Sequence, residues 1–73
     1  MTDLTAIPQS QQRVATLVAS GLMDKEIARD MGISPGAVKD RVERLLRYAG
    51  VRNRVQLTVW WLRQTGQLRE TVQ

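Results

Sequence analysis

The chain has 73 residues, of which 11 are lysine or arginine and seven are aspartate or glutamate, so its formal net charge is +4 at pH 7. A chain this short forms one domain, and the absence of cysteine and histidine excludes disulfide bonds and the usual zinc sites. Stability must therefore come from a small apolar core, which a second chain could complete.

The first half of the sequence predicts two short helices, over 10–20 and 24–31. Apolar residues recur in both segments at spacings of three and four, as on the core-facing side of a helix. Ser10 is a candidate N-cap of the first helix, and Gly32 permits the positive φ of a tight turn after the second. The apolar residues of these faces are Val14, Leu17, Val18, Ile27, Ala28 and Met31.

Two further helices are predicted over 35–49 and 54–65. Ser34 and Pro35 mark the first start, because serine caps free backbone N–H groups and proline suits the first helical position. Asn53 is a good cap for the last helix. The apolar stripe of the third helix is formed by Val38, Val42, Leu45, Leu46 and Ala49.

Together these elements predict an all-α fold, with a single domain over 1–73 whose ends, 1–6 and 67–73, fray. No strand is expected, since the β-favouring run TVWW lies inside a helical window. The densest apolar stretch, 59–62, is far too short to cross a bilayer, and the N-terminus lacks the pattern of a secretory signal. We therefore expect a cytoplasmic protein with no membrane partner.

The sequence offers no residues for catalysis. It lacks a histidine base, a thiol nucleophile, a glycine-rich phosphate loop and a cluster of metal ligands. We therefore expect no enzyme activity, no cofactor and no metal.

Positive charge is concentrated in the second half of the chain. Residues 1–38 carry three basic and four acidic side chains, net −1, whereas residues 39–73 carry eight basic and three acidic ones, net +5. This imbalance favours a polyanionic partner, although an excess of arginine also occurs on ordinary solvated surfaces. A short helix, a glycine turn and a longer helix form the arrangement in which the second helix enters the major groove of DNA.

The charged residues of the third helix share the face opposite its apolar stripe. Lys39 is a candidate donor to guanine, and Asp40 or Glu43 is a candidate acceptor from a cytosine amino group. Solvation and local i,i+4 pairing, such as that of Asp40 with Arg44, are the alternative explanation of this face. The candidate contacts to the DNA backbone are Ser34, Arg41, Arg44, Arg47, Arg52 and Arg54.

Trp60 and Trp61 are adjacent on the fourth helix, where successive residues diverge by about 100°. The two indoles therefore cannot both face the same core. Either one fills the core and the other lies over arginine or leucine side chains, or an indole from each of two chains packs against the partner helix. The residues predicted for such a two-fold interface are Leu57, Trp60, Trp61 and Gln64.

The run VATLVASGLMDKEIARDMGISPGAVKDRVERLLRYAGVRNRVQL, residues 14–57, resembles the LuxR/GerE-type helix-turn-helix domain. The resemblance has no gap, extends over 7–66 and rests on ASGL, KEIA, GIS, G-x-VK, V-x-x-L and GVRNR-x-Q in order. It implies a four-helix domain whose third helix reads the major groove and whose fourth helix mediates dimerisation. It also implies that Lys39, Asp40 and Glu43 lie toward base edges and that Arg41 and Arg47 lie nearer the backbone.

The chain departs from the family pattern at four positions. Gln11 stands where an acid is common, Ala37 replaces a frequent threonine, and Asp40 and Glu43 place two carboxylates toward DNA. Carboxylates repel phosphate, so these two either read cytosine or lower the affinity for DNA.

The expected function is that of a sequence-specific, double-stranded DNA-binding transcriptional regulator of bacterial or phage origin, associated with the nucleoid. We expect a stand-alone homodimer on an inverted repeat, without a segment that binds a small molecule or accepts a phosphoryl group. The alternative is a protein-interaction module that inhibits a larger related regulator by heterodimerisation through the fourth helix. A third interpretation is a region that contacts promoter DNA and RNA polymerase, similar to the terminal domain of a sigma factor.

Overall fold

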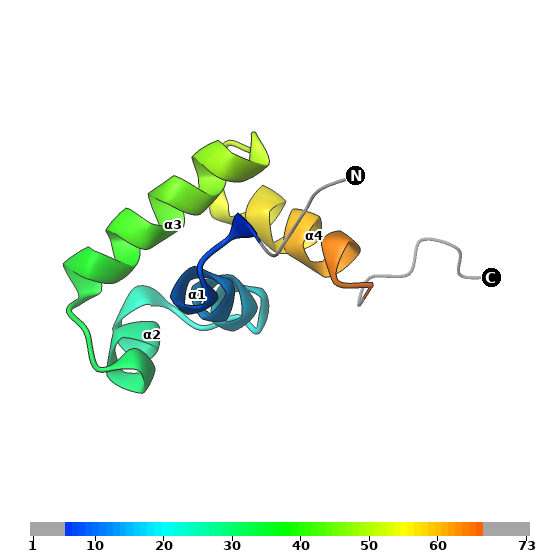
Figure 1. Cartoon of the computed structure of the whole chain (residues 1–73). Helices are drawn as coiled ribbons and strands as arrows, with labels where there is room; N and C mark the ends of the chain where they lie inside the picture. Colours follow the sequence, from blue (N-terminus) through cyan, green and yellow to red (C-terminus); the bar gives the residue numbers. More distant parts are fainter. Residues whose placement is uncertain (1–5, 67–73) are drawn as a thin grey trace.

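Four helices make up the described part of the chain, residues 6–66, in the computed structural model (Figure 1). They are α1 (Gln9–Ala19), α2 (Asp24–Met31), α3 (Pro35–Ala49) and α4 (Arg54–Gln64). The predicted all-α fold is confirmed, and each predicted bound lies within one residue of the observed one. Of the ends predicted to fray, 1–6 and 67–73, all but residue 6 lie outside the described residues. No helix within 6–66 has the length and apolar character needed to span a bilayer.

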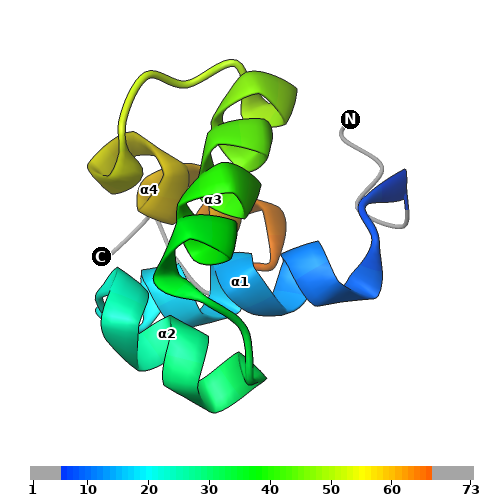
Figure 2. The ribbon, with the colours of Figure 1, turned by 90° about the vertical axis from the view of Figure 1, so that its left-hand side faces the viewer.

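The core lies where α1 meets the other three helices. α1 contacts each of them, and Figure 2 shows it crossing behind α3. The predicted apolar stripes supply most of the buried side chains, because spacings of three and four place them on one side of each helix. The buried hydrophobic residues are Ile7, Val14, Ala15, Val18, Ile27, Ala28, Val38, Val42, Leu45, Leu57 and Trp61.

Two residues of α4 are buried that the sequence analysis assigned to a dimer interface. Leu57 is 0% exposed and Trp61 is 5% exposed, and both belong to the chain's own core. This burial argues against the predicted interface role of both residues, which a structure of one chain does not test. The reason is geometric: they are spaced i,i+4 on the inner side of α4.

Capping residues fix where α3 and α4 begin. The Ser34 hydroxyl oxygen accepts a hydrogen bond from the backbone N–H of Ala37 at 3.1 Å, and Asn53 Oδ1 accepts one from Gln56 at 2.9 Å. Both caps were predicted. Gly32, with φ at 70°, makes the left-handed turn after α2 that sets the direction of α3.

The start of α1 differs from the prediction. Ser10 does not cap the helix, because the extended backbone of Pro8 (ψ 146°) begins it earlier, and the Pro8 carbonyl accepts from the N–H groups of Gln11 and Gln12. Ser10 lies inside the first turn. Its hydroxyl oxygen instead accepts a hydrogen bond from Arg41 Nη1 at 3.1 Å.

Two ion pairs join α2 to the helices beside it. Arg13 of α1 donates from Nη2 to Asp30 Oδ2 at 2.8 Å. Arg54 of α4 donates from Nη1 to Asp24 Oδ1 at 2.7 Å. The second terminal nitrogen of Arg54 donates to the Leu22 carbonyl at 2.8 Å. An exposed ion pair such as Arg13–Asp30 contributes at most about 1 kcal/mol, so the main effect of these contacts is to orient α2 while the core supplies most of the stability.

Candidate nucleic-acid interface

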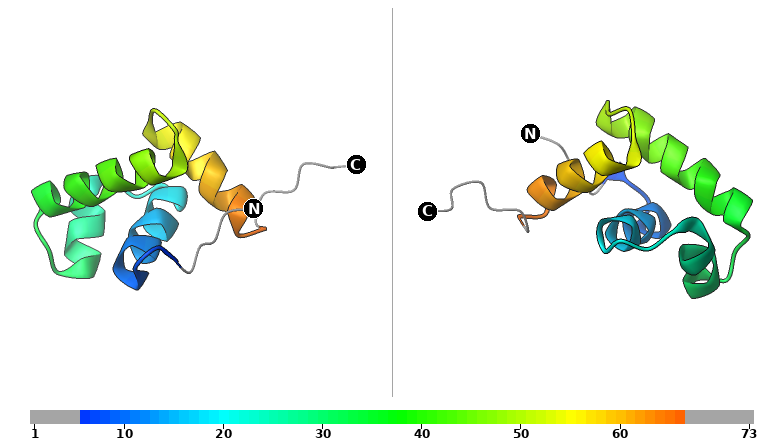
Figure 3. Two further views of the ribbon diagram at one scale, coloured as in Figure 1. Left: turned by 45° about the horizontal axis from the view of Figure 1, so that its top comes forward. Right: turned by 180° about the vertical axis from the view of Figure 1, so that it is seen from behind.

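The outer face of α3 is a long polar surface that no other helix of the described chain covers (Figures 2 and 3). Its inner face is held by Val38, Val42 and Leu45, whose exposures do not exceed 7%. The outer face carries three cations and two carboxylates, which gives it a net charge of +1. Its exposed charged side chains are Lys39, Asp40, Glu43, Arg44 and Arg47.

Only one of the possible i,i+4 ion pairs forms on this face among the described residues. Arg44 Nη2 lies 3.4 Å from Asp40 Oδ2. Lys39, Glu43 and Arg47 have no ion-pair or hydrogen-bond partner within residues 6–66. Local pairing therefore accounts for Asp40 and Arg44, whereas the other three side chains remain available to a ligand.

Arg41 lies on the flank of α3 that faces the start of α1, and its hydrogen bond to Ser10 joins the two helices. Beside this bond is a polar hollow of about 250 Å³, which we call the α1–α3 seam. The polar residues that line it are Ser10 and Gln11 from α1 and Asp40, Arg41 and Arg44 from α3.

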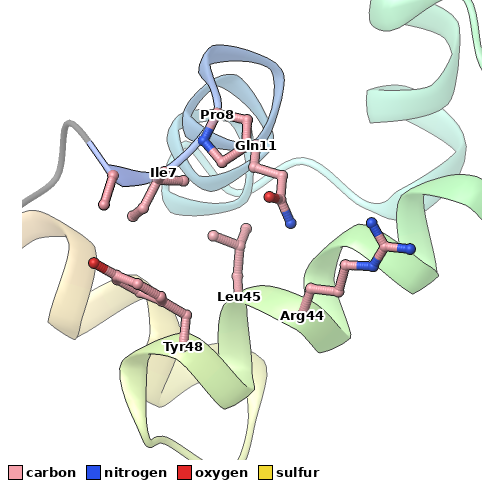
Figure 4. A pocket seen from close by; sticks show the side chains of 7 residues that line it. Ile7, Pro8, Gln11, Arg44, Leu45 and Tyr48 are labelled. Atoms are coloured by element: carbon pink, nitrogen blue, oxygen red, sulfur yellow. The ribbon is translucent and has the colours of Figure 1, made fainter.

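The same two helices enclose a second, more apolar hollow of about 150 Å³ (Figure 4). Leu45 and Tyr48 of α3 point toward Ile7 and the start of α1. Gln11 and Arg44 line both this hollow and the seam, so the two spaces adjoin. Burial of Ile7 here holds residues 6–8 beside α3.

Arg52 and Arg54 have different surroundings, although the sequence analysis assigned both to the DNA backbone. Arg52 is exposed, and its side chain has no partner among the described residues. The guanidinium of Arg54 is half-buried and bonded to Asp24 and Leu22. The structure therefore gives Arg54 a role in holding α4 against α2, which a charge count along the sequence could not distinguish.

Ser34 combines its capping role with a position at the exposed start of α3. Its hydroxyl oxygen accepts from the Ala37 N–H, and a hydroxyl has one hydrogen left to donate. A phosphate oxygen is a suitable acceptor, so capping and backbone contact are compatible for this residue.

The outer side of α4 carries an apolar groove of about 400 Å³. Val55 is 73% exposed, and Val59 and Trp60 are half-buried beside it. Trp60 packs edge-on against Tyr48, with ring centroids 6.2 Å apart and planes at 76°. Gln64 also lines the groove. Of the predicted interface residues, Trp60 and Gln64 lie here, whereas Leu57 and Trp61 lie on the opposite, buried side.

Val55 and Val59 were not predicted to contribute apolar surface. They are spaced i,i+4, and so are Leu57 and Trp61, which places the two pairs on different sides of α4. A helix with apolar residues on two sides has more apolar surface than one small core can cover. The presence of two apolar i,i+4 pairs in one helix was the sequence pattern that could have indicated this exposed apolar surface.

Residues 8–61, from the start of α1 to Trp61, match the model of a known family described as bacterial regulatory proteins, luxR family. The chain is also similar to "Putative HTH-type transcriptional regulator YhjB" of Escherichia coli (strain K12), with 41% identity over 54 residues. That match covers 74% of this chain and 27% of the other, so the chain spans about a quarter of the length of this curated relative. No solved structure matches the chain.

Proposed function

Because the chain belongs to the luxR family of bacterial regulatory proteins, we propose that it regulates transcription as a homodimer that reads an inverted repeat in double-stranded DNA. Its helix-turn-helix is the DNA-binding domain of that family. The observation that carries the proposal is the outer face of α3, where Lys39, Glu43 and Arg47 are exposed and unpaired on a helix fixed by the core.

In this proposal the residues of α3 divide into two groups. Lys39 donates to guanine and Glu43 accepts from a cytosine amino group, since both side chains are free on the outer face. Asp40 already holds Arg44 through one oxygen whereas Glu43 has no partner among the described residues, so we assign the acceptor role to Glu43. The proposed contacts to phosphates are those of Ser34, Arg41, Arg44, Arg47 and Arg52.

The groove on α4 supports the proposal of a homodimer. Val55, Val59 and Trp60 leave apolar surface on the side of α4 that faces away from the core. A second copy of α4 would cover this surface and give the pair a two-fold axis. The two α3 helices would then read half-sites about one helical turn of DNA apart. Such a regulator would act at the nucleoid, in the cytoplasm.

The test is selection of bound duplexes from a random library, followed by titration of the selected duplex at two salt concentrations. An enriched inverted repeat and an affinity that falls steeply with salt support the proposal. Equal binding to all sequences would contradict the proposal that α3 reads bases. No DNA binding, together with a tight complex with a larger luxR-family protein, would favour the inhibitory heterodimer instead.

Two variants make this test specific to residues. Lys39→Ala should weaken binding by about 1–3 kcal/mol for duplexes that carry the preferred base at one position. Its binding to duplexes that lack this base should not change. Arg47→Ala should weaken binding to all sequences alike and lower the salt slope by about 0.9. Equal effects of the two variants on every duplex would contradict the division of roles.

A further inference from the structure

We propose that the α1–α3 seam is a second contact with the DNA backbone, a phosphate site to which α1 contributes Ser10 and Gln11. This inference rests on the proposed function and extends it, because the outer face of α3 uses no residue of α1. The ligand is a phosphodiester group of the strand that runs beside α3.

The hydrogen bond between Arg41 and Ser10 arranges the site. Arg41 Nη1 donates to Ser10 Oγ at 3.1 Å, which holds the guanidinium at the edge of the seam. Guanidinium has five N–H donors, so the others remain for an anion of matching geometry. The Ser10 hydroxyl accepts this bond and keeps its own hydrogen to donate.

The charge of the seam suits a phosphate. Arg41 and Arg44 contribute two positive charges and Asp40 one negative charge, which leaves a net charge of +1. The Asp40 carboxylate is held by Arg44 at 3.4 Å, so its charge is partly compensated before any ligand arrives. Gln11 adds a neutral amide with two N–H donors. The volume of about 250 Å³ is that of several water molecules, which a phosphate group would displace.

The position of the seam is the third observation. Arg44 belongs both to the exposed outer face of α3 and to the lining of the seam. A helix in the major groove has a phosphate backbone along each flank, and the flank that carries Arg41 opens onto the seam. DNA that contacts Lys39 and Glu43 would therefore bring one strand past Ser10.

The decisive comparison is between Ser10→Glu and Ser20→Glu in the full chain. Both replace an exposed serine of the α1 region by glutamate, one at each end of the helix. An acid in the first turn favours a helix, so Ser10→Glu should fold. Its carboxylate would pair with Arg41 and repel phosphate. Ser20 follows Ser10 by ten residues, about 15 Å along the helix, which exceeds the Debye length of about 10 Å at 0.1 M salt.

We expect Ser10→Glu to bind the selected duplex and an unrelated duplex about tenfold more weakly, with a salt slope lower by about 0.9. Ser20→Glu should bind both as the unmodified chain does. Ser10→Ala, which removes only the hydroxyl, should weaken binding about two- to threefold, and Ser10→Thr should restore it. Added to Arg41→Ala, Ser10→Ala should have a smaller effect than it has alone, because part of its effect comes from positioning Arg41.

Each contrary result has a distinct meaning. If the unmodified chain binds DNA and Ser10→Glu binds as tightly as Ser20→Glu, the seam is not a phosphate site and the proposed function stands. If the unmodified chain binds no duplex at low salt, both the function and the site are overturned. Full additivity of Ser10→Ala with Arg41→Ala would show that Ser10 does not position Arg41.

Discussion

Arg54 at the start of α4 and Asp24 at the start of α2 form an ion pair of 2.7 Å, although 30 residues separate them in the sequence. Arg54 also donates to the Leu22 carbonyl, so one guanidinium joins α4 to both the turn before α2 and its first residue. Arg52, two residues earlier, has no such contacts among the described residues. Neighbouring arginines of equal charge are thus expected to have different roles.

This contrast predicts opposite effects of two alanine substitutions. Arg54→Ala removes a half-buried ion pair and a charged hydrogen bond, so the free energy of unfolding should fall by about 1–2 kcal/mol. Arg52→Ala should leave unfolding unchanged and weaken DNA binding on all sequences. Thermal unfolding at one protein concentration measures the first effect and duplex titration the second. Equal loss of stability in both variants would contradict the assignment.

Substitution of the two carboxylates of α3 should also affect DNA binding in different ways. Glu43→Gln replaces an unpaired acceptor, and discrimination in favour of cytosine at one base position should fall by about 1–3 kcal/mol. Asp40→Asn instead frees Arg44 and removes a negative charge, so binding to every duplex should tighten without a change in base preference. Repeating the duplex selection with each variant gives the comparison. A changed base preference in Asp40→Asn would mean that Asp40 reads DNA directly.

The two sides of α4 predict different results for neighbouring residues. Val55→Glu places a charge in the outer groove, so it should convert a dimer to monomer while the domain stays folded. Trp61→Ala empties part of the core and should lower the free energy of unfolding by about 3–5 kcal/mol. Sedimentation equilibrium and thermal unfolding measure the two outcomes, with Ser20→Glu as the control for added charge. If Val55→Glu sediments as the unmodified chain does, the outer side of α4 is not the interface.

Two glycines near the turn should respond in opposite ways to alanine. Gly32 has φ at 70°, where a Cβ atom is strained, so Gly32→Ala should destabilise the domain by about 1 kcal/mol. Gly36 lies in the first turn of α3, and a Cβ there meets only Ser34 Oγ, at 3.9 Å. Gly36→Ala should therefore stabilise by about 0.5–1 kcal/mol, since it lowers the entropy of the unfolded chain. Thermal unfolding of both variants should show shifts of opposite sign.

Helix periodicity and capping residues were enough to predict the four helices, because both act over a few neighbouring residues. The stripe with Val38, Val42 and Leu45 identifies the inner side of α3 without any knowledge of its neighbours. The same stripe places Lys39 and Glu43 outside. The exposed reading face could therefore be predicted from local spacing alone.

Contacts between distant segments could not be predicted in this way. Spacing does not reveal that Arg54 bonds Asp24 or that Arg41 bonds Ser10, since these pairs depend on how the helices cross. The different burial of the two tryptophans of α4 also depends on how the helices cross. Adjacent indoles are equivalent in the sequence, and only the packing of α1 against α4 decides that Trp61 is buried and Trp60 is not.

The outer groove of α4 also bears on how a target gene would respond to the amount of this chain. If the DNA-reading form is a pair, its concentration rises with the square of the unpaired chain while pairs are scarce, by mass action. Doubling the supply of chain then raises occupancy of an unsaturated operator about fourfold. The groove formed with Val55 and Val59 would thus turn a gradual change in synthesis into a sharper change in transcription.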